Sequence, residues 1–346
     1  TTGIDSLYRD EALPISGRSN CFGHTFAAAI GCNMSGDALL KCLRALPADK
    51  VLVSVLDWLN PNWPDAAAAG AALRESIHSM MPKGVDLDHL VAGFMPAFAP
   101  FMPWAATVDG TAQGLRDQPL RVIQSGNYNN VPTILGTNAN ECNLFVPLLP
   151  LVVRNATFPP NNESFIQTFE HTLEMYNQTV VRSIAQRALL EYPESSFRDQ
   201  YWRLGAAYTD FIFSCSARRA ARALSQRGAP VWLYQFTKAI PNWIDYDLLG
   251  DYHTIELSFV WNTQFPPIVH SFTPDEQLLS GSMQAYWTNL ARAGDPNNGT
   301  ATQVAWPPYR TSTDLSIQFD TPVGVRSGLL SGFCDFWDQV EVELGH

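Results

Sequence analysis

The chain has 346 residues, of which 46% are hydrophobic and 16% charged, and its formal net charge at pH 7 is −11. This length and apolar content are typical of a globular protein with a substantial core and exclude a disordered chain. An acidic chain without a Lys/Arg cluster is not expected to bind nucleic acid, and its apolar runs are far shorter than the ~20 residues that cross a bilayer.

Short apolar runs alternate along the chain with longer amphipathic stretches. The runs at 132–136 and 230–236 indicate buried strands, and the stretches at 211–228 and 275–294 have the periodicity of helices. The second stretch ends at Gly294 before an Asp-Pro pair, which is typical of a helix end. This alternation favours an α/β fold with a mostly parallel sheet and helices on both faces. Because no repeat or Gly/Ser linker marks a boundary, we expect a single domain.

Six cysteines and five Asn-x-Ser/Thr acceptors point to the compartment in which the protein matures. Both features are typical of an oxidising, glycosylating route, so we expect a secreted glycoprotein. The predicted glycosylation sites are Asn33, Asn155, Asn162, Asn177 and Asn298.

Two segments carry candidate catalytic residues. The stretch VPTILGTNANECNLF places Glu141 just after an apolar strand, and GDYHTIELSFVW places His253 112 residues later. Together these segments resemble the acid and histidine segments of the type-B carboxylesterase, cholinesterase and lipase family, in which a serine is the nucleophile.

The resemblance covers most of the chain, with its segments in family order. It includes LYRDEALPISG at 7–17, the stretch 32–52 with its CLR triplet, the long run 106–145, YWTNLARAGDPN at 286–297 and VAWPPY at 304–309. It implies an α/β-hydrolase fold, in which the catalytic residues follow the chain order nucleophile, acid, histidine. The order of these segments over most of the chain makes the match more specific than any one segment.

The serine of this family should lie in a Gly-x-Ser-x-Gly turn upstream of both segments, and the 346 residues contain no such turn. Two Gly pairs after residue 320 have the right spacing, but Arg326 and Leu330 stand at their centres. We therefore interpret residues 1–346 as the C-terminal two-thirds of a single α/β-hydrolase domain. The serine, the oxyanion loop and the N-terminal strands are expected before Thr1.

The resemblance assigns roles to both residues. His253 would take the proton of the attacking hydroxyl and return it to the leaving alcohol, and Glu141 would orient the imidazole and stabilise its charged form. Thr254 stands where the family usually has Gly, whereas Glu256 and Phe259 match the family. The reaction needs no metal or other cofactor, and we predict none.

The family pattern also selects disulfides. Cys32 with Cys42 would close a short loop, and Cys215 with Cys334 would attach the C-terminal segment to the rest of the fold.

A third disulfide is a hypothesis based on the expected parallel sheet. Cys142 follows the acid where the family usually has Gly, and Cys21 lies just beyond the preceding strand. Because parallel strands bring their carboxyl ends to one edge, a Cys21–Cys142 bond is expected there; the alternative is two buried thiols.

The apolar run at 144–153 has two interpretations, because it could border the substrate entrance or belong to the core. The first functional hypothesis is an esterase or lipase that acts on a small-molecule or lipid ester. In it, the serine lies on a separate N-terminal fragment, and the assembled enzyme is compatible with a homodimer. The second hypothesis is a catalytically inactive, cholinesterase-like protein-binding module.

Overall fold

The computed structural model describes residues 31–32, 38, 41–42, 45–46, 108, 114–149, 156–173, 176–240, 249–263 and 270–344. The chain divides into two compact units, one of residues 7–118 and one of residues 119–346 together with 1–6. In the first unit, a disulfide joins Cys32 to Cys42, as predicted. The unit of residues 119–346 carries the sheet and is described below.

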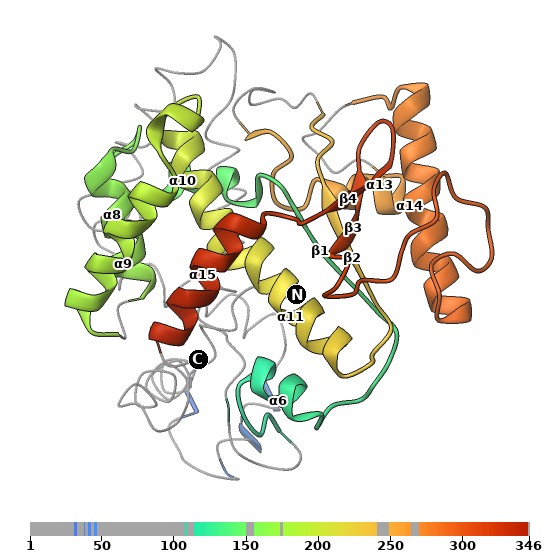
Figure 1. Cartoon of the computed structure of the whole chain (residues 1–346), viewed down its shortest axis with the longest axis horizontal. Coiled ribbons are helices and arrows are strands. Elements are labelled where there is room, and N and C mark those ends of the chain that lie inside the picture. The colour runs from blue at the N-terminus through green and yellow to red at the C-terminus, as the bar shows by residue number, and fades with distance from the viewer. Residues whose placement is uncertain are drawn as a thin grey trace. The chain divides into compact units, whose positions relative to one another are not determined.

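The sheet has four strands in the order β1-β2-β3-β4 within the described residues (Figure 1). These strands are β1 (Thr133–Asn138), β2 (Val231–Phe236), β3 (Leu315–Phe319) and β4 (Gly324–Ser327). The first three run parallel, and β4 pairs antiparallel with β3. The strands predicted at 132–136 and 230–236 are confirmed as β1 and β2.

Helices connect and cover these strands. The described α-helices are α6 (Pro119–Ser125), α8 (Asn162–Thr172), α9 (Gln178–Glu191), α10 (Gln200–Thr209), α11 (Cys215–Gln226), α13 (Glu256–Trp261), α14 (Pro274–Ala293) and α15 (Ser331–Glu343). The short helical turns are η2 (Glu141–Leu144), η3 (Val146–Leu148), η4 (Glu194–Ser196) and the π-helical η5 (Asp210–Ser214). Among the described residues, none of these helices has the length and apolar character to span a bilayer.

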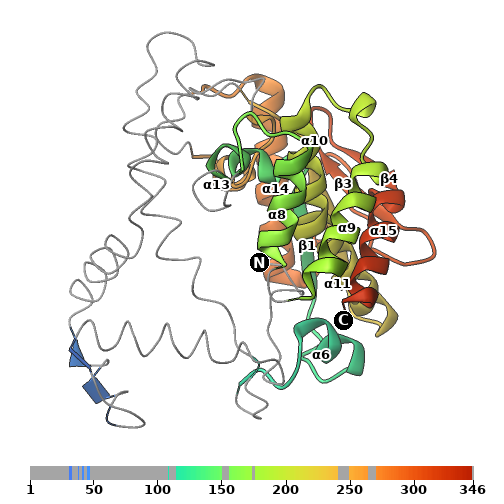
Figure 2. The same ribbon diagram turned by 90° about the vertical axis from the view of Figure 1, so that its left-hand side faces the viewer.

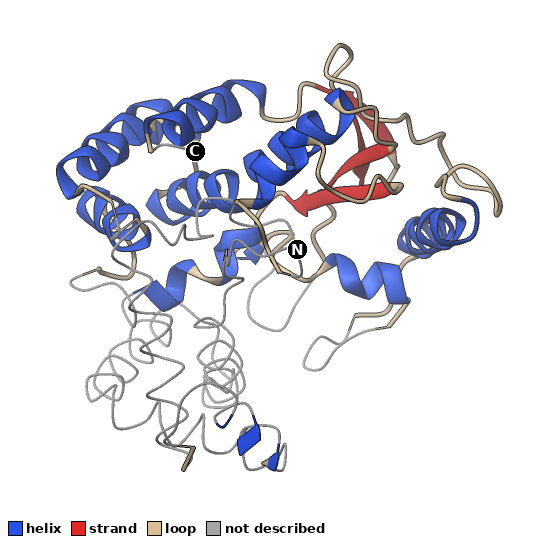
Figure 3. Cartoon of the chain, turned by 90° about the horizontal axis from the view of Figure 1, so that it is seen from below, coloured by secondary structure: helices blue, strands red, loops and turns tan. Residues whose placement is uncertain are grey.

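Strand β2 is buried on both faces, which explains its nearly continuous apolar sequence. Val231 and Leu233 pack in one cluster with the alanines of α11. The alternate residues point the other way, where the ring of Tyr234 contacts Trp287 of α14 and that of Phe236 contacts Phe259 of α13. Figure 3 shows helices on both sides of the strands, so the predicted α/β layering is confirmed.

The predicted helices form for local reasons. Thr273 and Glu276 make a reciprocal capping box at the start of α14, and Gly294 ends that helix in the left-handed conformation, with φ of 71°. The other stretch, predicted at 211–228, begins as the π-turn η5 and continues as α11. Both helices are confirmed, whereas the π-turn was not predicted.

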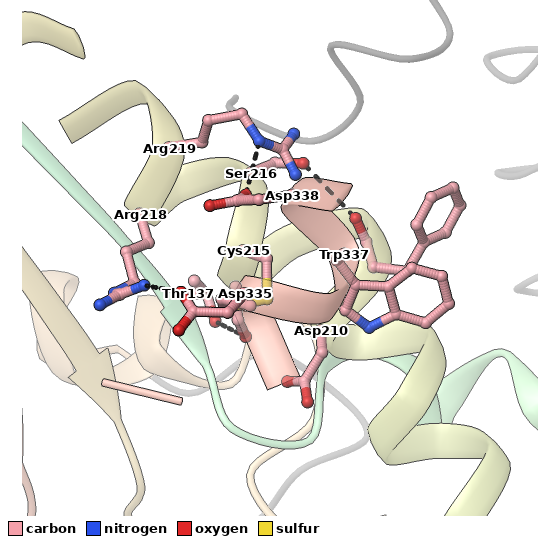
Figure 4. Close-up of a disulfide and its surroundings, with 12 residues drawn as sticks. Thr137, Asp210, Cys215, Ser216, Arg218, Arg219, Asp335, Trp337 and Asp338 are labelled. Atoms are coloured by element: carbon pink, nitrogen blue, oxygen red, sulfur yellow. Dashed lines mark hydrogen bonds and ion pairs between the residues drawn. A yellow bond between two sulfur atoms is a disulfide. The ribbon is translucent and has the colours of Figure 1, made fainter. Parts of the chain in front are cut away.

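A second hydrophobic cluster joins α8, α9, α10 and α15, which lie together in Figures 1 and 2. Trp337 of α15 stacks on Phe169 with ring centroids 5.3 Å apart, and its Nε1 donates to the hydroxyl of Tyr192 at 2.8 Å. The Cys215–Cys334 disulfide ties the start of α11 to α15, as Figure 4 shows. The predicted attachment of the C-terminal segment is confirmed.

Ion pairs add to this attachment of α15. Arg219 and Arg222 of α11 both contact the carboxylate of Asp338, at 2.9 and 2.7 Å. Figure 4 shows Arg219 beside Asp338. The buried Arg218 pairs with Asp314 in the loop before β3. Helix α15 is therefore held by a covalent bond, an aromatic cluster and charge-assisted hydrogen bonds.

Candidate active site

The acid loop, residues 138–141, leads from the end of β1 into η2 and positions Glu141. The Glu141 side chain is only 7% exposed. Its Oε1 accepts a hydrogen bond from the backbone N–H of Asn138 at 2.8 Å, which leaves Oε2 directed at the histidine. A buried carboxylate needs such partners, and here they also fix its orientation.

The histidine loop, residues 251–253, brings His253 to the same edge of the sheet. Its Nδ1 lies 2.5 Å from Oε2 of Glu141, which is shorter than an ordinary N–H···O hydrogen bond, and charge assistance between an imidazole and a carboxylate favours such shortening. The His253 side chain remains 36% exposed, and within the described part of the chain its Nε2 makes no hydrogen bond. The imidazole is therefore held at one nitrogen and available at the other.

Two aromatic rings flank the imidazole. The ring of Phe145 lies 5.4 Å from the His253 ring, and that of Phe213 lies 5.3 Å from it, centroid to centroid. Phe213 belongs to η5, and π-turns of this kind occur often at functional sites. The surroundings of the imidazole are thus apolar on the sides that these rings cover.

Electrostatics favour the charged imidazole. Burial lowers the pKa of His253, but the hydrogen bond that its Nδ1–H donates to Glu141 and the charges of Glu141 and Glu256 outweigh this effect, so the pKa lies above the ordinary value of 6.5. Glu256 is itself a partly buried acid, whose pKa is raised mainly by desolvation. Its Oε2 accepts a hydrogen bond from Nδ2 of Asn138 at 2.6 Å.

Thr254, which replaces the family's usual Gly, adopts a φ of 76°. This left-handed conformation is easy for Gly and unfavourable for a β-branched residue. Thr254 therefore stands at a position whose backbone conformation favours Gly. The loop geometry that brings His253 to Glu141 is nevertheless retained.

A second histidine–carboxylate pair lies elsewhere in the unit. Nε2 of His270 is 2.8 Å from Oε2 of Glu276, but the same carboxylate also caps α14 and pairs with Lys238 at 3.3 Å. The Glu276 carboxylate thus has a structural role, because it caps α14 and binds two basic side chains. These contacts make His270 a structural histidine rather than a candidate catalytic one.

The predicted Cys21–Cys142 bond is wrong, because Cys142 is a free, fully buried thiol. Its backbone N–H donates to the hydroxyl of Thr209 in α10, and the residue faces that helix. Burial raises the pKa of the thiol well above its usual value, so it is an inert core group. Cys21 lies outside the described residues.

Three of the predicted glycosylation sites are described, and all three are exposed: Asn162, Asn177 and Asn298. Asn33 and Asn155 lie outside the described residues. Glycosylation itself stays a prediction.

The apolar run at 144–153 belongs in part to the core. Val146 and Leu149 are buried in the cluster with α8, α9 and α10, which favours the core interpretation for both. Among the described residues of this run, Phe145 contacts the histidine ring. Residues 150–153 lie outside the described part of the chain.

Sequence reasoning missed the residues that connect the two loops. Oδ2 of Asp251 accepts the backbone N–H of Ala139 at 2.6 Å, and Nδ2 of Asn138 donates to the carbonyl of Tyr252 at 2.9 Å. Burial above all raises the pKa of Asp251 to about 7. The available signal in the sequence was an acidic residue, Asp251, two positions before the histidine.

A partly parallel sheet covered by helices, with an acid after one strand and a histidine in a later loop, is the arrangement expected for the acid and histidine part of an α/β-hydrolase. Comparison with known proteins agrees: residues 15–337 match the model of the carboxylesterase family. The chain belongs to this family, and the predicted family and fold class are confirmed.

Individual relatives are similar at moderate identity. The acetylcholinesterase of Bungarus fasciatus is 28% identical over 68% of this chain and 39% of its own length. Carboxylesterase 5A of Canis lupus familiaris is 25% identical over 90% of this chain and 46% of its own length. The crystal protein of Dictyostelium discoideum is 25% identical over 69% of this chain and 42% of its own length. The chain therefore spans less than half the length of these relatives.

Proposed function

We propose that this chain supplies the acid and the histidine of a serine-dependent carboxylic ester hydrolase. The observation that carries the proposal is the 2.5 Å contact between Oε2 of Glu141 and Nδ1 of His253. The contact leaves Nε2 as the nitrogen for proton transfer. Membership of the carboxylesterase family supports the same reaction class.

In the proposed mechanism, Nε2 of His253 accepts the proton of a serine hydroxyl as its oxygen attacks the ester carbonyl. The imidazolium then donates this proton to the leaving alcohol, and the cycle repeats with water to release the acid. Glu141 holds the proton on Nδ1, so that Nε2 is the basic nitrogen, and stabilises the imidazolium during attack. Its burial strengthens this interaction relative to water.

The nucleophile is proposed to come from outside these 346 residues, because they contain no Gly-x-Ser-x-Gly turn. The relatives are more than twice as long as the parts of them that match this chain, which supports additional polypeptide in the active enzyme. We propose that an N-terminal fragment of the same esterase, held as a separate chain, brings the serine and the oxyanion hole.

The substrate is proposed to be an uncharged small-molecule or lipid ester. The rings of Phe145 and Phe213 beside His253 favour an apolar acyl or alcohol group next to the reacting carbonyl. The two disulfides and the exposed glycosylation acceptors support a secreted enzyme.

The experiment combines a fluorophosphonate probe with intact mass analysis of the native material. We expect the probe to label a smaller N-terminal fragment, and we expect H253Q to abolish both labelling and ester turnover. H270Q is the matched control, because it breaks the other histidine–carboxylate pair and should leave both readouts unchanged.

Two outcomes contradict the proposal. Label found on the 346-residue chain itself would contradict the external serine. A native sample with all its polypeptides that takes up no label and hydrolyses no ester would instead favour the inactive, protein-binding alternative.

A further inference from the structure

Asp251 is a buried acid that the proposed mechanism does not use. It is 5% exposed and stands two residues before His253. A carboxylate in such a place is unfavourable unless hydrogen bonds compensate for its lost hydration. Its Oδ2 finds such a partner in the backbone N–H of Ala139, at 2.6 Å. The contact crosses from the histidine loop to the acid loop.

The connection is reciprocal. The backbone N–H of Asp251 donates to Oδ1 of Asn140 at 3.3 Å, so, besides the bond from Asn138 to the Tyr252 carbonyl, each loop offers the other one backbone donor and one side-chain acceptor. The N–H of Ala139 is shared with the carbonyl of Phe236, at 3.0 Å, where β1 leaves its ladder with β2. The carboxylate thus holds the acid loop at the point where strand pairing ends.

The backbone beside this contact is shaped to admit it. Gly250 has a φ of 62°, and a Cβ at this position would lie 2.2 Å from Oδ1 of Asn140. Any side chain there would displace the Asn140 amide from the histidine loop. The close approach of the two loops therefore depends on Gly250 in one segment and on Asn140 in the other.

We propose that Asp251 and Asn140 are positioning residues whose two hydrogen bonds lock the acid loop to the histidine loop and so align Glu141 with His253. The inference rests on the proposed function, because it concerns the same two catalytic side chains. Glu141 and His253 are 112 residues apart, and only tertiary contacts can fix their separation. A displacement of about 1 Å in such a pair can reduce a rate by about 10²-fold.

The test uses the assembled enzyme with D251A, D251N and N140A. D251A removes the acceptor, and N140A removes the reciprocal acceptor at a half-buried position where folding is less at risk. We expect both to lower kcat by about tenfold or more, with KM within about twofold. D251N keeps an oxygen that can accept the Ala139 N–H and should restore most of kcat.

N289A is the matched control, since Asn289 is also buried and its Oδ1 accepts a backbone N–H, from Thr300, outside the site. It should lower stability and leave kcat unchanged. A second readout is the low-field proton resonance of Nδ1–H in His253, which reports its short bond to Glu141. We expect D251A and N140A to shift or broaden it, and N289A to preserve it.

The inference is overturned if D251A or N140A folds and keeps both the kcat and the resonance of the unmodified protein. It is also overturned if D251N is as impaired as D251A. The two readouts distinguish failure of this inference from failure of the proposed function. An unmodified protein without ester turnover would refute the esterase, and the resonance would still report whether Asp251 and Asn140 position Glu141 and His253.

Discussion

The Cys215–Cys334 disulfide offers a quantitative prediction about stability. The bond joins residues 119 positions apart, so it strongly restricts the unfolded chain. We consider the double substitution C215A/C334A, which removes both thiols and prevents exchange with Cys142. In the folded state, Trp337 would still stack on Phe169, so α15 should stay docked.

The magnitude follows from loop closure. A separation of 119 residues corresponds to about 5 kcal/mol at 25 °C, whereas the separation of 10 in the Cys32–Cys42 loop corresponds to about 2.7 kcal/mol. Folded domains are stable by about 5–15 kcal/mol in total. Loss of the long-range bond should therefore remove a large part of the stability of the unit of residues 119–346.

The assay is hydrogen exchange read on peptides from α11 and α15 across a urea series, which follows this unit alone. We expect C215A/C334A to lower the unfolding free energy of these peptides by about 5 kcal/mol. C32A/C42A, in the other unit, serves as the control and should leave them nearly unchanged. A loss below about 1 kcal/mol for C215A/C334A would refute the argument that the bond acts through the unfolded chain.

Three further predictions concern charge and backbone strain. E256Q removes a charge that raises the pKa of His253, so the acid limb of kcat/KM against pH should move to lower pH; an unmoved limb would contradict this assignment. T254G relieves a positive φ and should raise the unfolding free energy by about 1 kcal/mol in urea titrations, and no gain would show that the loop is unstrained. Asp210, whose pKa burial raises from 3.8 to about 7, retains a proton in the folded state that the unfolded chain releases. The free energy of unfolding should therefore fall as pH rises from about 4 to 7, and it should change less with pH in D210N. In denaturant titrations at pH 5 and pH 8, an equal change in unfolding free energy for D210N and the unmodified protein would contradict this assignment.

The fold was predictable where the signal is local. The strand 230–236 and the helix 275–294 carry their own periodicity and end signals, and both form as expected. Strand β4 (Gly324–Ser327) is short and has no buried residue, so it has no apolar pattern to find. The π-turn η5 also left no local signal, although it sets the position of Phe213 beside the histidine.

The site was predictable through resemblance and not through spacing. Nothing local in the sequence requires Glu141 to meet a histidine 112 residues later; the family segments supplied that expectation, and the structure brings the two together. Asp251 and Asn140 could not be predicted in the same way. Their importance lies in a contact between two loops, which no local pattern encodes.

The error at Cys142 has a geometric cause. Adjacent parallel strands do bring loops to one edge, but the residue after Glu141 lies in the 3₁₀ turn η2, where successive side chains point about 120° apart. Glu141 therefore faces the histidine while Cys142 faces α10. A prediction from strand edges alone cannot resolve this rotation.

The two histidine–carboxylate pairs show what separates a candidate catalytic pair from a structural one. Both have short contacts, 2.5 Å for His253 with Glu141 and 2.8 Å for His270 with Glu276. Glu276 divides its oxygens among a helix cap, a lysine and the imidazole, so its charge is largely neutralised and its task is to begin α14. Within the described part of the chain, Glu141 accepts one backbone N–H and contacts one imidazole, and the other edge of that imidazole is partly exposed. A carboxylate that serves a single, partly exposed imidazole can respond to the charge that forms during proton transfer, and this difference is why catalysis is assigned to His253.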